Sequence, residues 1–388
     1  MVSIIIWDAE ENRVEDTLPD EEQINILHSA AEILPDAPVI LEELRKVAQS
    51  DITKLYQLGQ NHFFVFDATM ADGAHYIVRI ARFSDPTELS YIRDKVQREC
   101  EILKWMDSLA SLPVPRPILC EVNSASPPFM ITSKCEGIEV IFGFGTLSED
   151  AKIRNLRSFA RFAIAMFQAQ CPQQIGSIMR FSSNSPRNSR STKVEIGPAV
   201  AYRKTETPSQ CFSSAQEYIR WLIACKQNRA SSVVNVGPIL RRAEAIFVEE
   251  DRRQDADQLR CIPCHGDAVS HNILIDDSGE ITGVIDWEFH MILPAYLAVD
   301  YPSWITYDGL QDPKFFPNTG QFSPFWPTSR QEAASLRQLY DNIVKKLDYQ
   351  YYLSLKRGEI ARLIMQWLIT DEDREGEKLE SWLDSLSM

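Results

Sequence analysis

The stretch that decides the fold reads C-H-G-D-A-V-S-H-N-I-L-I-D over residues 264–276, and it is followed after a polar turn by G-V-I-D-W-E over residues 283–288. Two short apolar segments flank this turn, which contains Asp, Ser and Gly, and such a turn between two apolar runs predicts a β-hairpin. Asp267 and Asn272 precede the first strand, and Asp286 belongs to the second. The sequence therefore predicts a cluster of polar side chains beside a small hairpin.

The second strand of this hairpin alternates apolar and acidic residues. Successive side chains of a strand point to opposite faces, so Ile285 and Trp287 are expected on one face and Asp286 and Glu288 on the other. Carboxylates presented in this way suit a divalent cation.

Each of these polar residues also has an alternative, structural interpretation. Asp267, Asn272 or Asp286 alone could be an Asx residue that caps a strand end. Taken together, at these spacings, they favour catalysis. Glu288 has two interpretations, a ligand for metal or substrate and a solvated carboxylate at the end of a strand.

A small antiparallel sheet and a long helix are expected upstream. Residues 55–82 read as strands, because aromatic and β-branched runs stand on either side of the turn signal Asp72-Gly73. Residues 86–109 carry apolar side chains mostly at three- and four-residue intervals, which predicts a helix. Glu99 falls on its apolar face, where a buried carboxylate needs a partner, whereas Glu101 lies off that face and is expected to be solvated.

The rest of the chain is expected to be mainly helical. Residues 128–132 read as one more strand and residues 151–170 as a strongly apolar helix. Between that helix and another near residues 215–225, residues 177–193 are rich in Ser, Asn and Arg and are expected to form a loop. We place the boundary between two lobes near residue 135.

The pattern H-G-D-x-x-x-x-N followed by I-D-W resembles the catalytic and metal-binding motifs of aminoglycoside phosphotransferases and related choline-kinase-like small-molecule kinases. The resemblance covers roughly residues 50–345, with the parts in the same order. It implies an α+β, two-lobed protein-kinase-like fold, with a small antiparallel-sheet N-terminal lobe and a larger, mainly helical C-terminal lobe. The corresponding domains are an acidic N-terminal extension over 1–50, an N-lobe over 51–135 and a C-lobe over 136–388.

The resemblance also implies a role for each residue of the motif. Asp267 would orient the acceptor hydroxyl and accept its proton, while Asn272 and Asp286 would hold the Mg²⁺ ions that bridge the phosphates of ATP. His265 would mainly tie the loop to neighbouring backbone. Catalysis would then depend on in-line placement and charge neutralisation.

Kinases of this kind pair a cation on the third N-lobe strand with a helix glutamate, and Arg79 and Glu99 occupy those positions. Kinases generally have Lys there, whereas many fungal-type members of the family are similar to this chain in having Arg. Without the motif, the two residues could equally form a plain buried ion pair. By the same resemblance, a loop with one glycine would cap the triphosphate with help from Asn61, and residues 131–136 would be the hinge that binds adenine.

The composition excludes several classes of protein. With 55 acidic and 40 basic residues, the net charge of -15 has the wrong sign for a nucleic-acid-binding protein. The chain has no basic leader and no apolar run long enough to span a membrane, so we expect a soluble, cytoplasmic protein. The eight cysteines are expected to be reduced, and the C-x-x-C-H match over residues 261–265 is accidental, because haem attachment implies export.

The expected function is ATP- and Mg²⁺-dependent phosphorylation of a hydroxyl on a small molecule, such as a secondary metabolite, an amino alcohol or a sugar. The alternative is a catalytically impaired nucleotide-binding or scaffold protein, which Arg79 and the glycine-poor loop favour and the intact set of Asp267, Asn272 and Asp286 disfavours. A protein kinase is less favoured, because no A-P-E segment or recognisable activation loop follows Asp286. The acceptor, the choice of ATP over GTP and the oligomeric state stay open.

Overall fold

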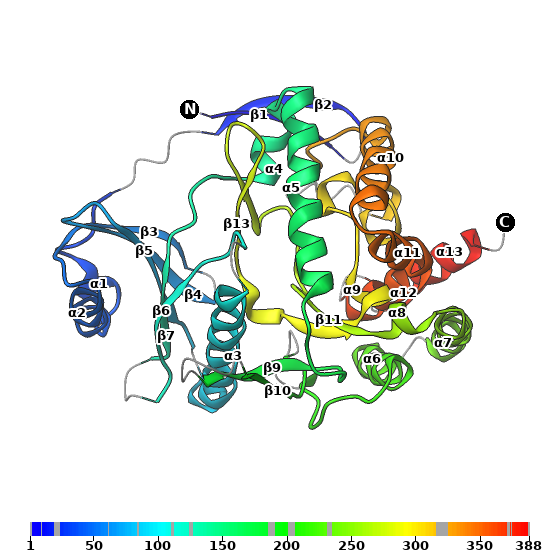
Figure 1. The fold of residues 1–388 in the computed structure, drawn as a ribbon, viewed down its shortest axis with the longest axis horizontal. Coiled ribbons are helices and arrows are strands. Elements are labelled where there is room, and N and C mark those ends of the chain that lie inside the picture. The colour runs from blue at the N-terminus through cyan, green and yellow to red at the C-terminus, as the bar shows by residue number, and fades with distance from the viewer. Residues whose placement is uncertain are drawn as a thin grey trace.

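The structure of the protein is a computed structural model, and it describes residues 2–8, 10–18, 24–60, 62–83, 85–109, 112–123, 127–184, 191–200, 206–230, 235–315, 325–370, 373 and 375–386. A small part built on an antiparallel sheet joins a larger, mainly helical part (Figure 1), which confirms the predicted α+β architecture. Among the described residues, no helix is both long and apolar enough to cross a membrane.

The small part is a five-stranded sheet in which every pairing is antiparallel. Its strands stand in the order β3 (Ile52–Gln60), β4 (Phe63–Met70), β5 (His75–Ala81), β7 (Phe129–Ser133) and β6 (Pro117–Glu121). The turn between β4 and β5 contains Gly73 at a φ of +86°, which glycine adopts without steric cost. The hairpin predicted at Asp72-Gly73 is therefore present, and the central strand β5 carries Arg79.

Helices cover both faces of this sheet. On one face lies α3 (Leu89–Ser108), the predicted long helix, preceded by a 3-10 turn. On the other face lie α1 (Ala30–Ile33) and α2 (Ala37–Ala48). Alternation along β7 serves both, since Met130 belongs to the core that α3 completes and Ile131 to the core that α2 completes.

The larger part is built around α5 (Glu149–Gln168), which stands in the middle of Figure 1 and confirms the helix predicted over residues 151–170. Its N-cap Ser148 accepts the N–H of Ala151, and its apolar side packs Phe159 against the buried ring of Trp304. The other helices are α4 (Val140–Gly143), α6 (Ala215–Arg229), α7 (Gly237–Arg252), α8 (Ala256–Leu259), α9 (Ala295–Ala298), α10 (Arg330–Leu347), α11 (Tyr349–Arg357), α12 (Glu359–Ile369) and α13 (Glu377–Ser385).

Two small sheets of the larger part frame the motif. The predicted hairpin is present, because β12 (Ile273–Ile275) pairs antiparallel with β13 (Ile281–Val284), and β12 pairs also with β8 (Ile138–Glu139). The second sheet joins β11 (Cys261–Cys264) to β14 (Met291–Pro294). Residues 265–272 therefore form a loop that is anchored by a strand at each end.

The prediction that residues 177–193 form a loop is wrong. This segment contributes two antiparallel strands, β9 (Ser177–Asn184) and β10 (Ser191–Gly197), which lie along α3 in Figure 1. Its polar composition concealed a strand, because Ile178 is fully buried and Phe181 and Val194 pack against the core. We call this element the β9–β10 hairpin.

The N-terminal 50 residues contact both parts of the molecule. Strands β1 (Val2–Trp7) and β2 (Arg13–Leu18) form a hairpin on the helical part, where Trp7 and Trp326 exchange backbone hydrogen bonds of 2.7 and 2.8 Å. Further along, Ile26 N–H donates to the carbonyl oxygen of Leu55 on the sheet, at 2.9 Å.

Candidate active site

The loop over residues 265–272 has a conformation that its own sequence enforces. Gly266 has a φ of +81°, and a Cβ at this position would lie 2.0 Å from the carbonyl oxygen of Phe289, so no side chain fits. At the other end, Asn272 N–H donates to Val269 O at 3.0 Å, and Ile285 N–H donates to Asn272 O at 2.9 Å. These bonds fix the end of the loop against the turn that follows β13.

His265 ties this loop to neighbouring backbone, as the resemblance implied. Its Nδ1 accepts the N–H of Asp267 at 3.2 Å, so the ring proton sits on Nε2 and is donated to Ile285 O at 2.7 Å. Burial lowers the pKa of His265 to about 4, so the ring is neutral near pH 7 and keeps this tautomer.

Asp267 and Asn272 are brought together inside the loop. The Nδ2 of Asn272 donates to the backbone oxygen of Asp267 at 2.9 Å and lies 3.4 Å from its carboxylate Oδ2. Burial, together with the nearby carboxylates of Asp286 and Glu288, raises the pKa of Asp267, although the contact with Asn272 opposes this shift. A carboxylate of raised pKa is a better proton acceptor.

Asp286 and Glu288 lie in a turn, so the alternation of faces predicted for residues 285–288 is wrong. Strand β13 ends at Val284, Asp286 adopts a left-handed conformation with a φ of +65°, and residues 287–289 form one turn of 3-10 helix. The positive φ ends the extended backbone on which a two-residue period depends. Trp287 anchors this turn, because its buried indole N–H donates to Val284 O at 2.8 Å.

Arg79 connects the sheet to this turn. One guanidinium nitrogen forms an ion pair with Glu99 of α3, and the other lies 2.8 Å from Asp286 Oδ1. The guanidinium also stacks 4.5 Å from the centre of the Phe63 ring. Burial alone would lower the pKa of Arg79, but the surrounding carboxylates outweigh this effect and raise it, so the cation is permanent.

Glu99 is buried, as the helical period predicted, with only 2% of its side chain exposed. Burial raises the pKa of its carboxyl group to about 7, in spite of the opposing effect of Arg79. Glu99, Asp286 and Glu288 each offer a carboxylate oxygen, and these three oxygens lie within 4.8 Å of one another. Such a group of hard oxygen donors can hold a divalent cation.

Lys95 is a member of this site that the sequence analysis missed. It lies one helical turn before Glu99 on α3, and its Nζ is 3.0 Å from Glu288 Oε1. Only 9% of the Lys95 side chain is exposed. The signal was present in the sequence, because a residue four positions before Glu99 shares its helix face.

Glu101 is the second correction on α3, because it is buried rather than solvated. Its Oε2 accepts the N–H of Phe181 at 2.7 Å, and its Oε1 accepts from Gln97 and Lys104. The β9–β10 hairpin covers this side of the helix. The apolar period of α3 alone could not indicate it, because the partner strand begins more than 70 residues later.

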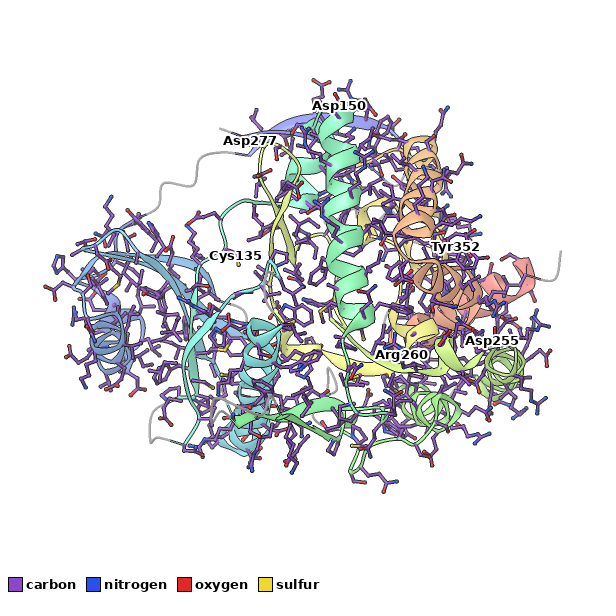
Figure 2. The ribbon with its side chains drawn as sticks, viewed as in Figure 1. Cys135, Asp150, Asp255, Arg260, Asp277 and Tyr352 are labelled. Carbon is purple, nitrogen blue, oxygen red and sulfur yellow. The ribbon has the colours of Figure 1, made fainter. Side chains whose placement is uncertain are left out.

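The segment predicted as the hinge, residues 131–136, begins in the last three residues of β7 and continues between the two parts of the molecule, where Figure 2 labels Cys135. A Cβ at Gly283 of β13 would lie 2.6 Å from the Cβ of Cys135, so a glycine lets the hinge approach the hairpin of the motif. Asn61 lies outside the described residues.

Comparisons of the sequence with known proteins identify the family of this chain. The Phosphotransferase enzyme family, APH, matches residues 59–297. "Clavilactone A biosynthesis cluster protein Y" of Ampulloclitocybe clavipes is 29% identical to this chain over 359 residues, which is 89% of this chain and 86% of that protein.

Two solved structures share the fold. Aminoglycoside phosphotransferase APH(4)-Ia, in a ternary complex with ADP and hygromycin B, aligns with a TM-score of 0.52 at 16% identity and covers 89% of this chain and 97% of its own. APH(2")-IIa, in a ternary complex with streptomycin and ATP, also has a TM-score of 0.52, at 13% identity, and covers 90% of this chain and 96% of its own. The chain has the two-lobed, protein-kinase-like fold of these structures, and, because the family match spans more than half of its length, it belongs to the phosphotransferase enzyme family.

Proposed function

We propose that this protein is a kinase that transfers the terminal phosphoryl group of ATP, in the presence of Mg²⁺, to a hydroxyl group of a small molecule. The observation that carries the proposal is the assembly of Asp267, Asn272 and Asp286 at one place, with Arg79 joining Asp286 to the sheet. A scaffold protein needs no such arrangement of two carboxylates, an amide and a fixed cation.

Asp267 is proposed as the base that accepts the proton of the acceptor hydroxyl. Its raised pKa suits this task, and the contact with Asn272 holds its carboxylate in one orientation. Neutral His265 fixes the loop without adding charge, because both of its ring nitrogens are engaged with backbone groups.

The residues present fit a divalent metal ion. Asp286 keeps 35% of its side chain exposed, and Glu288 has a buried Oε2 without a hydrogen-bond partner among the described residues. Asn272 uses its side-chain Nδ2 for its contacts with Asp267, so its side-chain oxygen Oδ1 can serve as a ligand of the metal. We propose that Asn272 and Asp286 hold Mg²⁺, which would neutralise the phosphate charge that develops during transfer.

Arg79 is proposed to bind the phosphates of the nucleotide, oriented by Glu99. A guanidinium presents several donors in a planar fork, so Arg79 can keep one side on Glu99 and offer the other to a phosphate. A fixed positive charge of this kind stabilises phosphoryl transfer without any covalent chemistry.

The acceptor is proposed to be a hydroxylated secondary metabolite. This class is supported by the relative named for a biosynthesis cluster and by the solved relatives that hold aminoglycosides. The net charge of -15 favours a cationic or neutral acceptor over an anionic one. We propose that the reaction takes place in the cytoplasm.

The first test is calorimetric titration of ATP into the wild-type protein with and without Mg²⁺, repeated with Asp286→Ala. We expect binding that depends on Mg²⁺ and weakens at least tenfold in the variant, because a ligand of the metal is lost. Asp277→Ala is the matched control, since this exposed aspartate lies at the tip of the same hairpin (Figure 2) and contributes nothing to the site.

The second test separates catalysis from nucleotide binding. Asp267→Asn should bind ATP as the wild type does but transfer phosphate to an acceptor found by screening on the order of 10²- to 10⁴-fold more slowly. If the wild type binds no ATP, the kinase proposal fails. ATP binding with equal transfer by the wild type and Asp267→Asn would remove Asp267 from the mechanism.

A further inference from the structure

Buried charges of both signs gather where β5, α3 and the turn over residues 286–289 meet. Three carboxylates, those of Glu99, Asp286 and Glu288, meet the cations of Arg79 and Lys95, which leaves one formal negative charge. Four of these side chains are at least 86% buried, since the exposed fractions of Glu99, Glu288, Lys95 and Arg79 are 2, 6, 9 and 14%. Charges this deeply buried are screened much less by solvent and salt than charges at the surface.

Each of the two cations pairs with different carboxylates. Arg79 serves Glu99 and Asp286, and its nearest approach to Glu288 is 3.8 Å. Lys95 serves Glu288 at 3.0 Å.

The Lys95 ammonium is held firmly in this place. It lies 4.7 Å from the centre of the Phe289 ring and 5.9 Å from that of Phe63. Aromatic faces attract an ammonium group electrostatically, so these two rings help to hold it in place.

We propose that Lys95 is a positioning residue that neutralises Glu288, leaves Arg79 to Glu99 and Asp286, and so makes the site select a metal–nucleotide complex over a free divalent cation. In the absence of nucleotide, the two fixed cations offset most of the carboxylate charge, and free metal is attracted only weakly. Anionic phosphates are attracted by the same two cations and bring the metal with them.

The physical reason is that removing Lys95 changes two attractions in opposite directions. Without it, the group carries two negative charges instead of one, so a divalent cation binds more tightly. The anionic phosphates then lose part of the positive field and bind more weakly. A merely structural loss of Lys95 would loosen the site and weaken both. The nucleotide half of this inference rests on the proposed function, whereas the metal half does not.

The experiment is a titration of Mn²⁺ alone into the nucleotide-free protein, followed by electron paramagnetic resonance of the free ion, for the wild type and Lys95→Met. We expect Lys95→Met to bind Mn²⁺ about tenfold more tightly than the wild type. In a parallel calorimetric titration, the Mg²⁺ complex of a non-hydrolysable ATP analogue should bind severalfold more weakly to Lys95→Met.

Three further variants serve as controls. Lys95→Arg keeps the charge and should retain both wild-type affinities. Lys104→Met removes a charge from the other side of α3 and should change neither affinity. Glu288→Gln should weaken Mn²⁺ binding, and the Lys95→Met/Glu288→Gln double variant should return it to the wild-type value. If thermal melting shows that Lys95→Met does not fold, Lys95→Arg and Glu288→Gln carry the test.

Opposite changes in the two affinities support the proposal. Changes in the same direction, or the same effects in Lys104→Met, overturn it. Failure of the wild type to bind the nucleotide analogue would refute the proposed function alone, because the Mn²⁺ titration of the nucleotide-free protein still tests the role of Lys95.

Discussion

Helix α3 buries charged side chains on two sides, and the two sides use them differently. One side of α3 faces β5 and the turn over residues 286–289, and we call it the site side. There Lys95 and Glu99 pair with the side-chain charges of Glu288 and Arg79. Toward the β9–β10 hairpin, Arg98 and Glu101 pair with Asp94 and Lys104 of the same helix. Each of them also binds backbone beyond the helix, because Arg98 donates to Pro198 O and Glu101 accepts from Phe181 N–H. The charges of the site side form one network with the candidate site, whereas those of the second side connect the helix to the larger lobe.

This difference separates functional charge from structural charge. Glu101 has no free capacity for a ligand, because one carboxylate oxygen accepts from Phe181 N–H and the other accepts from Gln97 and Lys104. A group of carboxylates with fewer cations than anions keeps such capacity. The raised pKa of Glu99 indicates this, as does Glu288 Oε2, which has no hydrogen-bond partner in the part of the chain that the structure describes. Substitutions on the site side should therefore mainly change the rate of phosphoryl transfer. Substitutions on the hairpin side should mainly change the free energy of unfolding.

The largest effect is expected for Glu99→Ala on the site side, and it concerns the rate of phosphoryl transfer. Without Glu99, Arg79 loses the partner that orients it, so we expect phosphoryl transfer to fall on the order of 10²-fold, in line with the loss of one fixed electrostatic group. The measurement is the release of ADP in the presence of the acceptor.

Glu99→Gln tests whether this loss concerns function rather than folding. Burial raises the pKa of Glu99, because its charged form is costly to bury, and Gln is a neutral side chain of the same shape that avoids this cost. The free energy of unfolding of Glu99→Gln should therefore stay within about 1 kcal/mol of the wild type. A large loss of stability without a loss of transfer would contradict the division between the two sides.

For Glu101→Ala on the hairpin side, we expect a loss of stability with little change in the affinity for ATP. This change leaves the partly buried N–H of Phe181 without its acceptor, which should lower the free energy of unfolding by about 1–3 kcal/mol in urea denaturation. Glu101→Gln keeps an acceptor oxygen and should lose less. In the folded protein, the affinity for ATP should remain within about twofold of the wild type. A Glu101→Ala variant that is stable but no longer binds ATP would break the comparison.

The sequence predicted what depends on local patterns. The hairpin of β12 and β13, the helix α3 and the burial of Glu99 follow from turn chemistry and helical period, both of which involve neighbours within a few residues. The assignment of Arg79 and Asp286 to one site came from the resemblance of the motif to the phosphotransferase family and not from these local patterns.

What the sequence could not predict depends on distant contacts. Glu101 is buried by a hairpin that begins at Ser177, and nothing near Glu101 indicates that cover. The left-handed turn at Asp286 is held by loop contacts such as the bond of Ile285 with Asn272, and a strand was the simpler expectation. Lys95 was missed because a lysine on a helix is normally read as solvated.

The smallest effect concerns His290, which fastens the β9–β10 hairpin to the turn behind the site. Its Nδ1 donates to Trp287 O at 2.9 Å and its Nε2 accepts from Ile178 N–H at 3.0 Å. Burial lowers its pKa to about 4, whereas an unfolded histidine has a pKa of about 6.5. Between these values the unfolded chain binds the extra proton, so the free energy of unfolding falls by up to about 1.4 kcal/mol per pH unit as the pH is lowered.

Urea denaturation at pH 7.5, 6.0 and 5.0 measures this slope. Buried His265 contributes to it in the same direction, because its pKa is lowered to about 4 as well. We therefore expect the slope for His290→Asn to be lower than the wild-type slope by about 1.4 kcal/mol per pH unit, which corresponds to one proton. His62→Asn, which replaces an exposed histidine between β3 and β4, is the matched control. Glu99, whose pKa is raised to about 7, contributes a slope of the opposite sign below that pH, so the informative quantity is the difference in slope between the wild type and His290→Asn. Equal slopes in these two proteins would mean that His290 is not a buried neutral anchor of the β9–β10 hairpin.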